Sequence, residues 1–245
     1  MIRRLIFTAA TCLAIAAPAL AQTPSPAPAM AKPAKTLEYL TPDDIAPGRL
    51  LPPPPVDGSA AALADLAEVR AIIAARTPER LAQARWDDEH EDPSAFFAVM
   101  GPGFDLKALP ATTEVLRVVK LDAGLAATAA KTRFARKRPW AVDASIPTCD
   151  PDDKPLTSYP SGHATMGYAL AMTYAVLAPE KAEALMTRAS DYAYSREVCG
   201  AHYGSDTRAS EALSAVVVTA LLKDPRFVAK IDAARAELRA AKITR

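Results

Sequence analysis

Two of the three histidines in this sequence stand in short motifs with side chains that could bind an anion. His202 precedes Asp206 by four residues, a spacing that places both on one face if the segment is helical. A carboxylate on Nδ1–H would fix the imidazole tautomer and leave Nε2 as a base or nucleophile. Arg196, directly after Ser195, would add a guanidinium for phosphate. Taken alone, the pair could equally be a surface His–Asp contact, and the sequence lacks the HExxH and CxxC spacings of metal sites.

The second motif is formed by Pro160, Ser161, Gly162 and His163, at the start of an apolar stretch that we expect to be helical. A helix N-terminus presents free backbone N–H groups and the positive end of the helix dipole to an anion. Gly162 would allow close approach, the Ser161 hydroxyl would add a donor, and His163 could give a proton to a leaving group. By itself this motif also fits an ordinary helix cap with an exposed histidine.

The third motif is a basic run that ends in proline, and it comes first in the chain. Lys131 and Arg138 are seven residues apart, two helical turns, so we expect them to share a face and clamp an anion, with Pro139 ending the helix. A solvated helix face is the usual interpretation of such a run. Its members are Lys131, Arg133, Arg136, Lys137 and Arg138.

Together the three motifs are KX6RP, PSGH and SRX5HX3D, in this order. The combination resembles the phosphatidic acid phosphatase type 2 and vanadium haloperoxidase superfamily, and within it the secreted bacterial class A non-specific acid phosphatases. LLPPPP at 50–55, Ser158-Tyr159 and VCGAHY at 198–203 support this resemblance, which covers roughly residues 37–239. Departures from the family pattern are Ala164 in place of threonine and the segment 86–105, which leave the substrate preference open.

The resemblance implies an all-α fold and hydrolysis of phosphate monoesters through a phosphohistidine, without metal or other cofactor, inhibited by vanadate and fastest at acidic pH. It also makes a homo-oligomer plausible. It assigns His202 as nucleophile, Asp206 as the residue that orients it, and His163 as general acid and base. The implied phosphate ligands are Lys131, Arg138, Ser161, Gly162 and Arg196.

Several alternatives remain open at this point. A vanadate-dependent haloperoxidase would bind vanadate at His202, and phosphoryl transfer to nucleosides, hydrolysis of lipid phosphates or simple anion binding would use the same pocket. The acidic run 87–92 could bind a divalent cation, although a solvated loop is the usual reading. Tyr159, Phe96 and Phe97 could sandwich an aromatic leaving group, although core packing is commoner.

Apolar residues at helical spacing predict that these motifs lie on packed helices. Few glycines (9) and 6% aromatic residues also favour helix over strand, and we find no alternating strand pattern or repeat. We expect one all-α domain over 56–245. The predicted helices are 59–76, one from Pro78 with Thr77 as cap, 112–136, 164–177, 179–197, 206–222 and 225–243.

The N-terminus has the pattern of an export signal. Arg3 and Arg4 precede a short apolar run, and Ala19-Leu20-Ala21 predicts cleavage before Gln22, so that residues 1–21 form a signal peptide. Residues 22–55 hold many of the 22 prolines and predict an extended leader, with polyproline II at 52–55. We therefore expect a periplasmic protein with no membrane span.

Composition limits the class of protein further. Half of the 245 residues are hydrophobic and 23% are charged, as in folded globular proteins. The net charge of +1 becomes −1 once residues 1–21 are removed, which argues against a nucleic-acid binder. Only Cys149 and Cys199 remain after cleavage, and in an oxidising compartment they could form a disulfide or stay as buried thiols.

Overall fold

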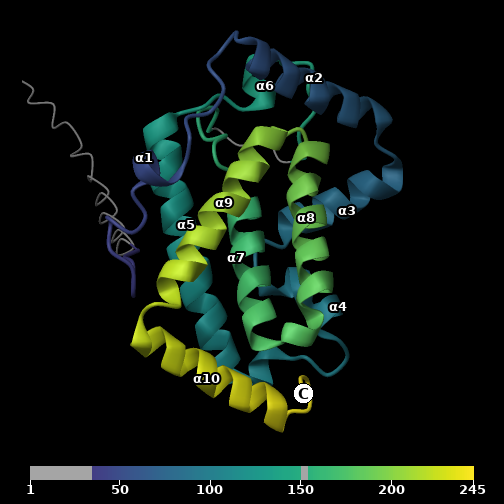
Figure 1. Cartoon of the computed structure of the whole chain (residues 1–245). Coiled ribbons are helices and arrows are strands. Elements are labelled where there is room, and N and C mark those ends of the chain that lie inside the picture. The colour runs from purple at the N-terminus through teal and green to yellow at the C-terminus, as the bar shows by residue number, and fades with distance from the viewer. Residues whose placement is uncertain (1–34, 150–153) are drawn as a thin grey trace, which may run out of the picture. The chain divides into compact units, whose positions relative to one another are not determined.

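The regular secondary structure of the described chain is entirely helical (Figure 1). This computed structural model describes residues 35–149 and 154–245; the predicted signal peptide and the start of the predicted leader lie outside them. The α-helices are α1 (Pro47–Leu50), α2 (Ala60–Ala75), α3 (Pro78–Glu89), α4 (Phe97–Met100), α5 (Pro110–Phe134), α6 (Pro139–Val142), α7 (Gly162–Leu177), α8 (Ala182–Val198), α9 (Gly204–Leu221) and α10 (Pro225–Ala240). The 3-10 turns are η1 (Pro93–Phe96), η2 (Leu106–Ala108) and η3 (Pro179–Lys181). The all-α prediction is confirmed.

Local capping explains where several helices begin. The Ser59 hydroxyl accepts the Ala62 N–H at 3.2 Å at the start of α2. The predicted cap at Thr77 is present, because its hydroxyl accepts the Arg80 N–H at 3.2 Å and Pro78 occupies the first helical position of α3. Each cap satisfies a backbone donor that the helix itself leaves unpaired.

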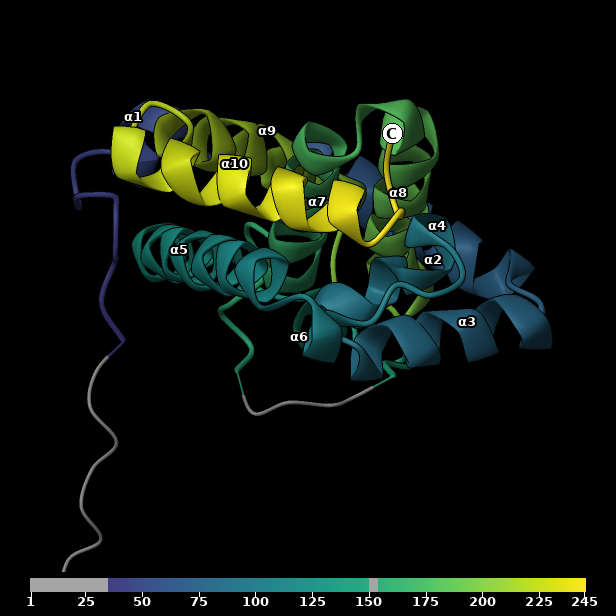
Figure 2. The ribbon, with the colours of Figure 1, turned by 90° about the horizontal axis from the view of Figure 1, so that it is seen from below.

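Helix α7 lies at the centre of the bundle and packs against α5, α8 and α9 (Figures 1 and 2). It is apolar on nearly all sides, and the run Ala164–Ala171 is buried throughout, as expected for a helix surrounded by protein. Helix α10 packs on α5, and α3 packs on α8. This arrangement keeps the N-terminus of α7 beside the ends of neighbouring helices.

Part of the predicted leader belongs to the folded core. Leu40, Ile45 and Leu51 are buried in the main hydrophobic cluster, and the Tyr159 hydroxyl donates to the Pro52 carbonyl at 2.8 Å. The chain from Lys35 onward forms one compact unit. The packing of residues 40–51 therefore ties this segment to the same domain as the motifs.

The end of α5 differs from the prediction. The helix stops at Phe134 because Ala135 takes the left-handed conformation, with φ 45° and ψ 40°. Arg138 lies beyond the helix, and Pro139 begins α6 instead of ending α5. The expectation that Lys131 and Arg138 share a helical face was therefore wrong, although both reach the same cavity, as described below.

A disulfide joins Cys149 to Cys199, the C-cap residue that follows α8. It links the chain before residues 150–153 to the loop that carries His202. Within residues 35–149 and 154–245, none of the helices is both long and apolar enough to cross a membrane.

Candidate active site

The three motifs meet in one cavity of about 630 Å³. Lys131 comes from the last turn of α5, His163 from the first turn of α7 and Arg196 from the last turn of α8. His202 lies in the short loop before α9. The predicted site residues that line the cavity are Lys131, Arg138, Gly162, His163, Arg196 and His202.

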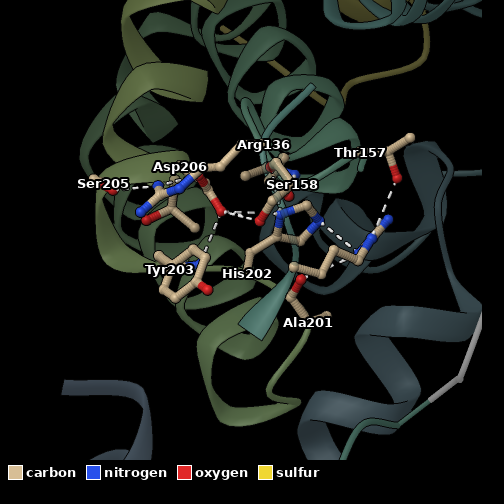
Figure 3. A network of polar contacts seen from close by, with 12 residues as sticks. Arg136, Thr157, Ser158, Ala201, His202, Tyr203, Ser205 and Asp206 are labelled. Atoms are coloured by element: carbon tan, nitrogen blue, oxygen red, sulfur yellow. Dashed lines mark hydrogen bonds and ion pairs between the residues drawn. The ribbon is translucent and has the colours of Figure 1, made fainter. Parts of the chain in front are cut away.

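The tautomer of His202 follows from its two neighbours (Figure 3). Its Nδ1 lies 2.7 Å from the Ser158 carbonyl oxygen, which can only accept, so Nδ1 carries the proton. Nε2 is then unprotonated and lies 3.2 Å from Arg138 Nη1, which donates to it. The imidazole is 1% exposed. Its lone pair is therefore held at the cavity, beside a fixed cation.

The contacts of Asp206 differ from the prediction. His202 precedes α9, so the pair is not helical, and Asp206 Oδ2 lies 3.5 Å from Nδ1, farther than the Ser158 carbonyl. The same carboxylate oxygen accepts the Ser158 hydroxyl at 2.5 Å and the Tyr203 N–H at 3.0 Å (Figure 3). Asp206 thus fixes the two segments that flank His202, in addition to the charge it places near the ring.

The three predicted cations surround the cavity next to His202, and Lys154 lines it as well. Arg138 also donates to the Ala201 carbonyl at 3.2 Å and, through Nε, to Thr157 Oγ1 at 3.3 Å, which fixes its guanidinium. Arg196 is 5% exposed and forms an ion pair with Asp88. Lys131 Nζ would lie 3.4 Å from a Cβ at position 162, so Gly162 leaves room for a ligand beside this ammonium.

His163 faces the same space from the rim of α7. Its Nε2 lies 3.1 Å from the Asp88 carbonyl oxygen, and its Nδ1 lies 3.7 Å from Glu91 Oε1. Burial and the charge of Arg196 lower the pKa of His163 well below its ordinary value, and the hydrogen bond to Asp88 opposes this. Burial, followed by the charges of Arg138 and Lys131, lowers the pKa of His202 in the same direction.

Ser161 is less accessible than the prediction requires. It is fully buried, caps α7 and accepts the Ala164 N–H at 3.3 Å. Its hydroxyl therefore has a structural task at the start of α7. A direct contact with phosphate remains a prediction.

Comparisons with known proteins identify the family of this chain. A family model described as the PAP2 superfamily matches residues 115–228. The chain is 32% identical over 196 residues to a non-specific acid phosphatase of Providencia stuartii, covering 77% of this chain and 79% of the relative. The chain belongs to the PAP2 superfamily. It is also 33% identical over 167 residues to a non-specific acid phosphatase of Salmonella typhimurium (63% of this chain, 66% of the relative), and 32% identical over 203 residues to an acid phosphatase of Zymomonas mobilis (78% and 75%).

Arg136 is a residue of this PAP2 site that the sequence did not single out. It is 6% exposed, and it donates to Asp206 Oδ1 at 2.6 Å and to Asp65 Oδ2 at 2.7 Å. Its guanidinium also lies over the Tyr203 ring, 4.0 Å from the centroid. Burial raises the pKa of Asp206 to about 6, and Arg136 is the largest opposing influence. The run of basic residues contained Arg136. Its role as a buried cation between two carboxylates depends on Asp65, which lies 71 positions away in the sequence.

The segment 86–105, whose role the sequence left open, contributes to the site through the end of α3. Asp88 binds Arg196 and Glu91 lines the cavity. Asp87 is fully buried and pairs with Arg188 and the Ser195 hydroxyl, which anchors α3 to α8.

The two weaker interpretations of this region find no support. Asp87 and Asp88 of the acidic run pair with Arg188 and Arg196, and within the described residues no group of three His, Cys, Asp or Glu side chains could hold a metal ion. Phe96 is fully buried and Tyr159 is 2% exposed, so both pack in the core instead of forming an open aromatic sandwich.

Proposed function

We propose that this PAP2 protein is an exported non-specific acid phosphatase that hydrolyses phosphate monoesters through a phosphohistidine at His202. The observation that carries the proposal is the unprotonated Nε2 of His202, held at the cavity by the Ser158 carbonyl and Arg138. An imidazole in this state is a nucleophile and needs no separate base.

In this mechanism, Arg138 Nη1 exchanges its hydrogen bond to Nε2 of His202 for one to a phosphoryl oxygen. The freed Nε2 lone pair then attacks phosphorus as the bond to the ester oxygen breaks. Lys131, Arg138, Arg196 and the Gly162 N–H neutralise the phosphoryl oxygens, a task that metal ions perform in other phosphoryl-transfer enzymes. Arg196 lines the cavity, and its Nε is buried without an acceptor among the described residues. His163 protonates the leaving oxygen and then takes a proton from the water that releases phosphate.

The pKa values favour reaction at acidic pH. Because the pKa of His202 is lowered by burial and by Arg138, its Nε2 stays unprotonated well into the acid range. The pKa of His163 is lowered by burial and by Arg196, so its protonated fraction grows only as the pH falls. A bound phosphate would offset the cations and raise the pKa of His163. We therefore expect the rate to rise from neutral toward acidic pH.

Export is part of the proposal. The disulfide between Cys149 and Cys199 supports an oxidising compartment, since such bonds are rare in the cytosol. The predicted signal peptide, residues 1–21, would direct the chain to the periplasm with cleavage before Gln22.

The test is hydrolysis of p-nitrophenyl phosphate in EDTA from pH 4 to 9, with and without vanadate. We expect vanadate-inhibited activity that is highest at acidic pH and falls by at least roughly 10³-fold in His202→Ala. His90→Ala is the matched control, because His90 stacks on Trp86 away from this cavity and should leave activity unchanged. When the reaction is stopped with base, mass spectrometry should detect the phosphoenzyme in the wild type and not in His202→Ala.

Near-normal turnover by His202→Ala would overturn the nucleophile assignment. A rate maximum above neutral pH would contradict the role of His163. Bromination dependent on vanadate, halide and peroxide, without phosphatase activity, would favour the haloperoxidase alternative.

A further inference from the structure

A second cavity, of about 500 Å³, continues from the catalytic cavity along helix α5. The two cavities share four lining residues: Glu91, Thr128, Lys131 and Gly162. Lys131 and Gly162 are proposed phosphate ligands, so a phosphate bound there would lie where the two cavities meet. The group esterified to it could then extend into the second cavity, which has the volume of a small-molecule pocket.

One face of α5 forms the floor of this second cavity. Lys120, Gly124, Thr128 and Lys131 follow one another at intervals of three or four residues, which places them on the same face. A Cβ at Gly124 would meet open space, so the middle of the floor is unobstructed. With a rise of 1.5 Å per residue, the Cα atoms of Lys120 and Lys131 are roughly 16 Å apart, and both long side chains can approach a ligand between them.

The walls combine apolar and basic side chains. Leu121, Leu125 and Met166 supply apolar surface, while the basic side chains are Lys35, Arg117, Lys120 and Lys131. The charge of Arg117 is shared with Glu38 and Glu114. Lys120 Nζ instead donates to the backbone carbonyl of Glu91, which is uncharged, although the charge of Lys120 also reaches the Asp92 carboxylate.

We propose that the second cavity is a leaving-group subsite for phosphate monoesters whose leaving group joins an apolar body to a second anionic group, with Lys120 as the residue that selects the anion. This inference rests on the proposed phosphatase function. The apolar body would cover Leu121, Leu125 and Met166, and the anion would pair with Lys120. Glu91, the acidic side chain of the wall, lies at the junction near His163.

The test compares two substrates of nearly the same shape, 4-carboxyphenyl phosphate and 4-carbamoylphenyl phosphate, which differ by one negative charge. The measured quantity is the ratio of their kcat/KM values. The intrinsic difference in reactivity between the two leaving groups is the same for every enzyme variant, so it cancels when the ratios are compared. Lys120→Met should lower the carboxylate-to-amide ratio by roughly three- to tenfold, because one charge pair at a partly exposed site is lost. Lys120→Arg should restore the ratio, and added salt should lower it in the wild type.

Lys181→Met is the matched control. Lys181 Nζ also donates to a backbone carbonyl, that of Val99 at 3.4 Å, but this side chain is remote from the two cavities. We expect the wild-type ratio in this variant. An unchanged ratio in Lys120→Met, or an equal loss on both substrates, would overturn the subsite while leaving the phosphatase proposal standing. Hydrolysis of neither substrate by the wild type would overturn the proposed function and the subsite with it.

Discussion

His202 is placed by contacts of two kinds, a carbonyl that fixes its proton and an arginine that faces its lone pair. The carboxylate of Asp206 accepts hydrogen bonds from the Ser158 hydroxyl and the Tyr203 N–H, on the two segments beside His202. Arg136 neutralises that carboxylate from the opposite side. At the scale of single residues, the placement of His202 therefore depends on a buried charge pair that does not itself line the cavity.

Substitution of Arg136 tests this dependence. Arg136→Gln leaves Asp206 and Asp65 buried without their cation, and breaking a buried pair in this way costs about 3–5 kcal/mol of stability. Because Arg136 opposes the rise of the Asp206 pKa, its loss should raise that pKa above about 6 and shift the pH profile of kcat. Urea denaturation and the pH–rate profile measure the two effects.

Two variants serve as controls for Arg136. Arg136→Lys keeps a positive charge and should recover part of the stability and the position of the pH profile. Lys137→Gln changes the neighbouring exposed cation, whose contact with Asp57 is 3.6 Å long, and should alter stability by less than about 0.5 kcal/mol. Equal stability of Arg136→Gln and Lys137→Gln would exclude the proposed role of the buried pair.

At the scale of elements, the site is assembled from helix ends. Lys131 and Arg196 occupy last turns, His163 occupies a first turn, and α3 ends at the residues that meet Arg196 and His163. Helix ends carry unpaired backbone groups and allow the chain to turn, so they can bring side chains from distant segments to one point. The left-handed conformation of Ala135 makes one such turn, since it ends α5 before the chain reaches Arg138.

The conformation of Ala135 gives a prediction about α5. A residue at φ 45° favours glycine, so Ala135→Gly should stabilise the protein by about 0.5–1 kcal/mol in urea denaturation. Ala129→Gly, within the same helix, should instead destabilise it by about 1 kcal/mol. The same sign for both substitutions would show that the end of α5 is not held in this conformation.

At the scale of the whole molecule, the disulfide joins two parts of the site. Cys149 follows the segment that contains Arg138, and Cys199 follows α8, three residues before His202. The Cys149 N–H also donates to the Cys199 carbonyl at 3.2 Å. The covalent link therefore constrains the loop that carries His202.

Loss of this bond should lower the stability of the whole domain. The sequence separation of 50 residues corresponds to a loop-closure contribution of about 4 kcal/mol, and measured losses are typically about 2–5 kcal/mol. Urea denaturation with and without dithiothreitol measures the effect. The double variant Cys149→Ser/Cys199→Ser should match the reduced wild type and show no response to dithiothreitol. Equal midpoints for oxidised and reduced wild type would rule out a stabilising bond.

The sequence by itself determined the helical class, the cap at Thr77 and the family, because these depend on local spacing and on residue types in a fixed order. It also named the six motif residues that the structure brings to one cavity. It misjudged the path from Lys131 to Arg138, since a seven-residue spacing fits a continuous helix as well as a helix that ends at Ala135. Only a left-handed backbone conformation separates the two cases.

The tertiary structure alone decided how these residues are held. The Ser158 carbonyl at His202 and the carboxylate of Asp65 at Arg136 come from positions 44 and 71 residues away in the chain. The end of α3 reaches Arg196 from 108 residues away, and the second cavity forms where α5 meets Glu91 and Met166. Such contacts leave no pattern in the local sequence, because they depend on which helix surfaces pack against one another around the hydrophobic core.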